Sequence, residues 1–324
     1  MLIRFVVLCI LLAPFHLAKG QGCSDAGFCT MGAMKPDQQY AKNVDIKLRS
    51  IELTSYMGAT LLTPMIYSVT ADVTLSITDR LFVQAKLPYQ IVKGNLGETS
   101  GLSDVSLSLT SNVLNTKKGS LNVTLGTKIP TNDSDLASTD SEFGPEGSDF
   151  PMYYQTSLGS YDLIVGASWI NDKWLFATGV QIALTENMND FRWGQWRGYP
   201  DGNIKEEWDP YIEDYDLANN LKRGTDIMLR IERNFRFTNY NFSLGLLPIY
   251  RITKDERLDF NTGERIKIDG TTGLALSALA SAGYSFNVNN GLKFIFGLKL
   301  AHRDVNPDGL TREYVLNLSY VYRF

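Results

Sequence analysis

The last stretch of the chain, from Arg312 to Phe324, alternates between two kinds of side chain and then stops. Aromatic and aliphatic residues recur at every second position, and most positions between them are polar or charged. A period of two is the repeat of a β-strand, so one face of this segment suits lipid and the other suits water. The apolar face comprises Tyr314, Leu316, Leu318, Tyr320, Tyr322 and Phe324, and the polar face includes Glu313, Asn317, Ser319 and Arg323.

A strand that ends a chain on an aromatic residue, with aromatics two and four positions earlier, resembles the terminal strand of bacterial outer-membrane β-barrels. In those proteins this strand is the signal for assembly, so the resemblance makes the barrel-assembly machinery an expected partner of Phe324. Every other hydrophobic segment is then expected to be a strand of the same barrel.

The beginning of the chain has the layout of a secretory signal peptide. A basic start, Met1 to Arg4, precedes the apolar run Phe5 to Leu17, which is too short to span a bilayer as a helix. Ala18-Lys19-Gly20 matches a small-x-small cleavage site, so residues 1–20 are predicted to be removed. Export of this kind leads to an oxidising compartment.

The next segment, residues 21–43, is polar and shows no periodicity. We interpret it as a periplasmic or lumenal segment that either folds into the lumen as a small plug or gate or remains an unstructured periplasmic tail. It contains Cys23 and Cys29, which an exported compartment favours joining in a disulfide. Acylation of Cys23 is the alternative, although Gly20 to Gly22 is a poor lipoprotein motif. Further soft ligands are missing from the neighbouring sequence, so neither a metal site nor a cofactor is predicted.

Residues 44–324 are predicted to form one transmembrane antiparallel β-barrel of about twelve strands, an all-β fold. Short turns at Thr78-Asp79, 115–119, 171–173, Thr238-Asn239 and 287–291 alternate with longer links, which is typical of periplasmic turns and outer loops. The last strand must pair with the first because lipid cannot satisfy a free sheet edge. The predicted strands are Asp45 to Met57, Tyr67 to Ile77, Leu81 to Val92, Ser103 to Val113, Ser120 to Pro130, Ser160 to Ile170, Trp174 to Thr185, Ile227 to Phe237, Tyr240 to Ile252, Leu274 to Phe286, Leu292 to Ala301 and Arg312 to Phe324.

Four short motifs suggest a family. They are Thr78-Asp79-Arg80-Leu81 before Leu87-Pro88-Tyr89, then Gly101 to Val105, then Leu125 to Thr131, then Tyr154 to Asp162. Together they resemble outer-membrane transporters grouped with the meta-pathway phenol-degradation protein, except that Ser103 stands where that family usually has glycine. The resemblance implies an outer-membrane barrel of a Gram-negative-type bacterium that takes up small, often hydrophobic molecules, and it implies no catalytic residues.

The strand phases place polar side chains inside the barrel. Either these residues pair across a narrow interior, or some of them line a conduction path. The lumen candidates are Asp72, Gln84, Lys86, Lys128, Asp162, Arg230, Glu232, Arg251, Lys293 and Lys299.

Two long outer loops carry further candidates. The loop from Phe191 to Thr225 contains Trp193, Trp196, Trp208 and Tyr211, which either bind a solute, act as a lid or form a small core of the loop. The acidic loop from Asn132 to Asp149 either is solvated or holds cations that bridge lipopolysaccharide.

The sequence argues against several functions. His302 is the only histidine after the signal peptide and lacks a serine two positions on, so a phospholipase-type site is not predicted. A net charge of −4 does not indicate a nucleic-acid partner. The expectation is a passive channel or transporter for small solutes in a membrane of lipid and lipopolysaccharide. The alternative is a non-conducting structural or surface-interaction barrel with a plugged lumen.

Overall fold

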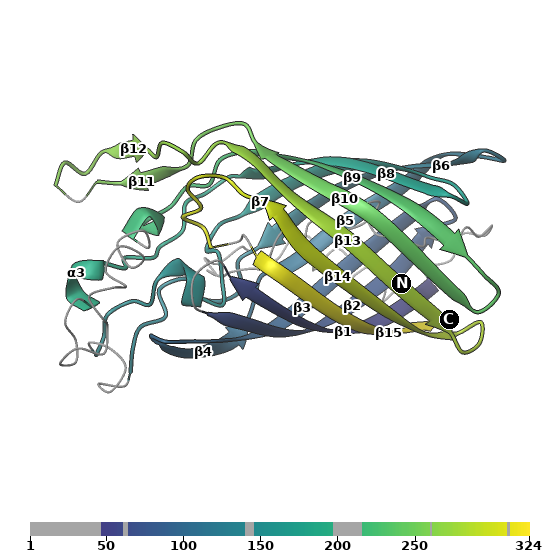
Figure 1. Ribbon diagram of the computed structural model, residues 1–324, viewed down its shortest axis with the longest axis horizontal. Coiled ribbons are helices and arrows are strands. Elements are labelled where there is room, and N and C mark those ends of the chain that lie inside the picture. Colours follow the sequence, from purple (N-terminus) through teal and green to yellow (C-terminus); the bar gives the residue numbers. More distant parts are fainter. Residues whose placement is uncertain (1–46, 61–63, 140–145, 197–215, 260, 310–311) are drawn as a thin grey trace, which may run out of the picture.

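The computed structural model describes residues 47–60, 64–139, 146–196, 216–259, 261–309 and 312–324, and shows an antiparallel β-barrel (Figure 1). Its first strand, β1 (Lys47–Thr60), pairs with its last, β15 (Arg312–Arg323), from Ser50 opposite Arg323 to Thr60 opposite Arg312. This pairing closes the sheet, so the barrel strands present no free edge to lipid. The structure thus confirms both the predicted barrel and the predicted closing pair.

Ten more strands complete the twelve of the barrel, each antiparallel to its neighbours. They are β2 (Met65–Thr78), β3 (Leu81–Gly94), β5 (Val105–Thr116), β6 (Gly119–Ile129), β7 (Asp162–Ile170), β8 (Trp174–Ala183), β9 (Asp226–Arg236), β10 (Tyr240–Arg251), β13 (Gly273–Ser285) and β14 (Asn290–Ala301). The remaining described elements are β4 (Gly97–Leu102), β11 (Glu256–Leu258), β12 (Arg265–Lys267), the short helix α3 (Trp193–Trp196) and the single 3₁₀ turns η2 (Met152–Tyr154) and η4 (Asp216–Ala218).

The outer surface of the barrel is apolar. On β6, Leu125 is 53% exposed, whereas Thr124 beside it is fully buried, and the other strands alternate in the same way. A soluble protein rarely exposes so continuous an apolar surface. The exterior therefore requires a bilayer, as in barrels of the bacterial outer membrane. Among the described residues, no helix is long and apolar enough to cross a membrane.

The two ends of the barrel differ. Short turns gather at the end where the C-terminus lies, and the longer links, β4, β11, β12 and α3 lie at the other end (Figure 1). We call these the turn end and the loop end. In barrels of this class the short turns face the periplasm, so the loop end faces outward.

Aromatic rings cluster on the outer surface near the turn end. Trp174 stacks on Phe176 at 5.7 Å between ring centroids, and Phe237 stacks on Tyr240 at 4.4 Å across the turn between β9 and β10. Aromatic side chains of this kind anchor a barrel at the level of the lipid headgroups.

The structure corrects the predicted strands in three places. The link between β1 and β2 is short rather than long, because both strands extend until Ala59 lies opposite Met65. Residues 97–102, predicted to lie mostly in a link, form β4, which pairs with the end of β3 and is joined to it by the Lys93–Glu98 ion pair. The predicted polar loop after β10 contains the β11–β12 hairpin.

The predicted signal peptide, the segment 21–43 and the Cys23–Cys29 disulfide lie outside the described residues. The plug assigned to that segment therefore stays a prediction.

Candidate functional site in the lumen

One outer loop enters the mouth of the barrel. All residues from Phe150 to Ser160 are buried, including η2, although loops usually expose their backbone. Gln90, which faces inward from β3, donates a hydrogen bond to the carbonyl of Gln155 at 3.4 Å. We call residues 150–160 the inserted segment.

Aromatic side chains fix the inserted segment to the barrel wall. Phe150, Tyr153 and Tyr154 pack with the inward-facing Tyr56, Ile66 and Val92 of the first three strands. Phe191 and Trp196 of the next loop join the same cluster, with Trp196 tilted against Phe150 at 5.3 Å.

Of the loop aromatics predicted as candidates, Trp196 therefore contributes to a core that holds the loops together. Trp193 opens α3, but its side chain, like Trp208 and Tyr211, lies outside what the structure describes.

Tyr154 sits against the backbone of β3. A Cβ atom added at Gly94 would lie only 2.3 Å from the Tyr154 hydroxyl oxygen, so glycine is needed for this close approach. The hydroxyl oxygen accepts a hydrogen bond from the Leu96 N–H at 3.2 Å, and the Tyr154 carbonyl accepts one from Thr99. Tyr154 is thereby held at both its side chain and its backbone.

Amide side chains complete the attachment. Gln155 Nε2 donates to the carbonyl oxygens of Leu136 at 2.9 Å and Phe150 at 2.7 Å. Asn189 Nδ2 donates to the carbonyl oxygens of Ser134 at 2.9 Å and Phe150 at 2.8 Å. Buried backbone groups of the loop thus find the partners they need away from water.

A network of buried ions lies beside the inserted segment, at the loop end of β9 and β10. Arg251 forms ion pairs with Asp226 at 2.7 Å, with Asp255 at 2.8 Å and with Asp308 at 2.9 Å. Arg303 lies 3.5 Å from Asp226. Three carboxylates around one guanidinium are stable in a buried site only because nearly every donor and oxygen has a partner.

Two further pairs belong to the same level of the lumen. Arg223 binds Asp162 at 2.6 Å, and Gln181 donates to the same carboxylate at 2.6 Å. Lys128 lies 3.7 Å from Asp104. Burial raises the pKa of Asp104 to about 8, and the charge of Lys128 opposes that rise.

The remaining lumen candidates also lie beside opposite charges. These pairs are Lys86 with Asp72 at 3.9 Å, Arg230 with Glu232 at 2.5 Å, Lys293 with Glu52 at 3.2 Å and Lys299 with Glu313. Gln84 donates to Asp72 at 2.7 Å. The structure therefore places the ten lumen candidates inside the barrel and links each to a polar or charged partner.

Sequence reasoning missed most of the ionic network, including Asp226, which is the first residue of β9 but was expected at the end of the preceding loop. Asp104, Arg223, Asp255, Arg303 and Asp308 lie in links between strands, where no periodicity indicates which way a side chain points.

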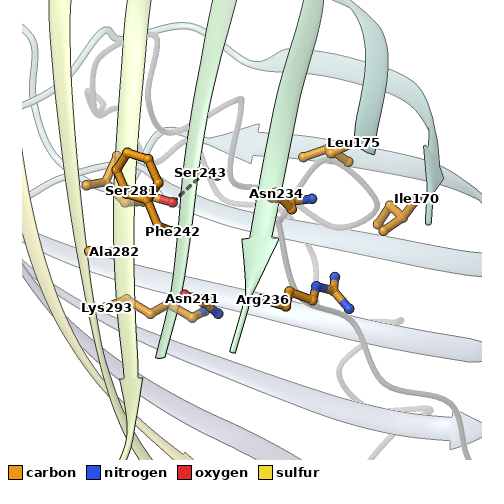
Figure 2. Close-up of a pocket in the computed structure, with 11 residues that line it drawn as sticks. Ile170, Leu175, Asn234, Arg236, Asn241, Phe242, Ser243, Ser281, Ala282 and Lys293 are labelled. Atoms are coloured by element: carbon orange, nitrogen blue, oxygen red, sulfur yellow. Dashed lines mark hydrogen bonds between the residues drawn. The ribbon is translucent and has the colours of Figure 1, made fainter. Parts of the chain in front are cut away.

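A cavity that opens to solvent lies in the lumen toward the turn end (Figure 2). Asn234, Asn241, Ser243 and Ser281 supply polar groups, with a hydrogen bond of 2.7 Å between the two serines. The cavity is also lined by two cations, Arg236 and Lys293, and by the apolar side chains Ile170, Leu175 and Ile295.

An apolar patch separates the cavity from the ionic network. It is formed by Ile164, Leu175, Ala177, Met228, Leu247 and Ile249. The order is plain along the inner face of β10, where Asn241 and Ser243 belong to the cavity, Leu247 and Ile249 to the patch and Arg251 to the network. Along β10 the inner face therefore changes from polar to apolar to ionic, whereas on β9 the Arg230–Glu232 ion pair lies beside Leu175 and Ala177 of the patch.

Outside the barrel, Asp149 begins the stretch that leads into the inserted segment. Burial raises its pKa to about 6, and the charges of Asp135 and Asp190 act in the same direction. Its carboxylate accepts a hydrogen bond from the Asp190 N–H at 2.9 Å, which opposes the rise. Within the described part of the chain, no group of three or more His, Cys, Asp or Glu residues is placed to hold a metal ion.

No protein-family model matches the sequence, and no curated protein sequence matches it. Among solved structures, the barrel is similar to an outer-membrane channel from Pseudomonas putida F1, with a TM-score of 0.56 and 16% identity over 89% of this chain and 99% of that one. It is also similar to the NanC porin, with a TM-score of 0.43 and 8% identity over 86% and 100% of the two chains. The CymD monoaromatic hydrocarbon channel has a TM-score of 0.39 and 11% identity over 95% of each chain. The first of these likenesses shows that the chain has the fold of an outer-membrane β-barrel.

Proposed function

We propose that this protein is a passive channel that lets small solutes with an apolar part cross the outer membrane. The observation that carries the proposal is the solvent-open cavity of mixed lining inside the barrel, continued toward the loop end by the apolar patch. A pocket with this mixed lining suits small molecules, whose apolar surface packs on Ile170 and Leu175 while amides and hydroxyls meet polar groups.

Two further observations support the proposal. The apolar exterior requires a bilayer, and the fold is shared with a protein named as an outer-membrane channel. The motifs that resemble the transporters grouped with the meta-pathway phenol-degradation protein agree with a solute that is small and hydrophobic.

The inserted segment limits this path. Residues 150–160 fill the mouth on the outer side, so a solute passes only when the segment shifts or through narrow gaps beside it. We therefore expect slow flux with a sharp upper limit on solute size.

Solute entry into liposomes that contain the purified protein tests the proposal. A series of alcohols and phenols of rising size should enter faster than into protein-free liposomes, with a cut-off near the size of a single substituted ring. Entry at the protein-free rate for all solutes would refute a channel.

A reversible lock tests the part played by the inserted segment. A Cβ added at Gly101 would lie 3.4 Å from Thr156 Oγ1, so Gly101→Cys with Thr156→Cys brings two thiols within bonding range once the Asn132 side chain moves. Oxidation should slow solute entry and a reductant should restore it. Wild-type protein under the same oxidant and reductant is the control.

The second candidate function is a sealed structural or surface-interaction barrel. It is favoured by the same eleven-residue inserted segment, because residues 150–160 are all buried. A sealed barrel predicts no flux in either redox state of the double-cysteine variant.

We propose that Phe324, which follows β15 and is 61% exposed, is recognised by the barrel-assembly machinery. We also propose that the loop end contacts lipopolysaccharide. Deletion of Phe324 should lower the yield of heat-modifiable barrel in the outer membrane.

A further inference from the structure

Arg233 is a charged side chain on the lipid-facing side of the barrel. On β9 it follows Glu232, which is buried in the lumen, and shares the outer face with the exposed Leu229 and Phe235. In the barrel strands as far as they are described, the other outward-facing charged side chains, Lys93 and Arg312, belong to the loop end. Arg233 instead lies near the turn end, three residues before β9 ends.

Aromatic rings hold the guanidinium in place. It lies 5.2 Å from the ring centroid of Trp174, its direct neighbour on β8, and 5.5 Å from that of Phe235. Contacts with ring faces use the flat sides of a guanidinium and leave its N–H groups free to donate in their own plane. Within the described residues, no carboxylate pairs with Arg233 and no group accepts a hydrogen bond from it.

A second cation lies beside it. Lys173, in the turn before β8, is exposed, and its carbonyl oxygen accepts a hydrogen bond from the Asn234 N–H at 2.7 Å. This bond brings the turn next to the strand that carries Arg233. Asp172, also exposed, is the acid of the same turn, so the local charge from these three residues is positive.

We propose that Arg233 binds the phosphate of a glycerophospholipid in the periplasmic leaflet of the outer membrane. Three residues of a tilted strand place Arg233 roughly 7 Å inside the end of β9, which is the depth of the headgroup region. The guanidinium fork matches two phosphate oxygens, Lys173 supplies a further positive charge, and Trp174 and Phe235 pack on the glycerol and the first acyl carbons. An arginine facing lipid with no such partner would be costly for the barrel.

Native mass spectrometry of the detergent-purified barrel, titrated with phosphatidylglycerol, tests the site. Wild type should retain one lipid about tenfold more tightly than Arg233→Gln, because a charge-assisted bidentate contact is lost. Arg236→Gln is the matched control, since Arg236 lies three residues along the same strand but lines the lumen cavity, and it should retain the lipid as wild type does. Arg233→Lys should fall between, because a lysine keeps the charge but not the fork.

Two competitors distinguish the source of the phosphate. Diacylglycerol, which lacks phosphate, should not replace phosphatidylglycerol, and a hundredfold excess of inorganic phosphate should not displace it. Equal retention by wild type and Arg233→Gln, retention of diacylglycerol at the same level, or displacement by inorganic phosphate would each overturn the proposal. The measurement involves no solute flux, so its outcome is independent of whether the barrel conducts.

Discussion

The side-chain amide of Gln155 is paired at both ends with the backbone of Leu136. Its Nε2 donates to the Leu136 carbonyl at 2.9 Å, and its Oε1 accepts from the Leu136 N–H at 2.9 Å. The side chain thus bonds both backbone groups of Leu136, as the backbone of a neighbouring strand would. It links two segments of the long loop between β6 and β7. Because Gln155 lies within the inserted segment, this contact controls how firmly the outer mouth is filled.

Gln155→Ala should loosen the inserted segment. It removes these two hydrogen bonds and a third to the Phe150 carbonyl, and leaves buried backbone groups unpaired, at a local cost of about 1–3 kcal/mol. We expect faster exchange of the amide hydrogens of residues 150–160 and faster solute entry. Asn261→Ala, in the exposed turn of the β11–β12 hairpin, is the control and should change neither.

The ionic network should respond strongly to loss of its central cation. Arg251→Met leaves Asp226, Asp255 and Asp308 buried without their shared partner, so unfolding of the folded barrel in urea should be easier by about 3–5 kcal/mol. Lys254→Met breaks the exposed pair with Asp269 and should cost far less, because solvent screens both charges. Equal costs for the two variants would mean that the network contributes no more than a surface pair.

An introduced arginine should cost more stability on the lipid face of a strand than on its lumen face. Val69→Arg points a charge into lipid far from either end of β2 and should destabilise the barrel by about 2–4 kcal/mol, whereas Thr70→Arg, on the inner face of β2, should cost much less. Unfolding of both variants in the same lipid vesicles measures the difference. Similar losses would show that β2 is out of phase.

Much of the barrel could be predicted from the sequence because each strand repeats with a period of two, as Tyr314 to Phe324 do on β15. The phase also gave the inward positions of Asp72, Arg230 and Arg251. It could not give the partners Asp255 and Arg303, since link residues have no period, nor the insertion of residues 150–160, since Tyr154 against Gly94 is a contact between distant segments. The sequence did not predict β4, because Gly97 and Gly101 are typical of turns and indicated a link between strands.

The loop end should depend on pH through Asp149. The pKa of Asp149 is raised by burial from 3.8 to about 6, so its contribution to stability is fully present below about pH 4 and is lost as the pH rises through about 6. Asp149→Asn keeps the shape and an acceptor for the Asp190 N–H but removes the titration. As the pH rises from 4 to 8, the midpoint of thermal unfolding of wild type should therefore fall relative to that of this variant. Parallel curves over that range would contradict the assignment.

Single-channel recording in planar bilayers tests the central claim, a passive channel narrowed by the inserted segment, most directly. Wild type should give a small, steady conductance. Gly94→Ala should give a clearly larger one, because its added methyl group would lie 2.3 Å from the Tyr154 hydroxyl and must displace that ring from the mouth. A folded barrel that shows no conductance in either form would contradict the account and leave the sealed barrel as the function.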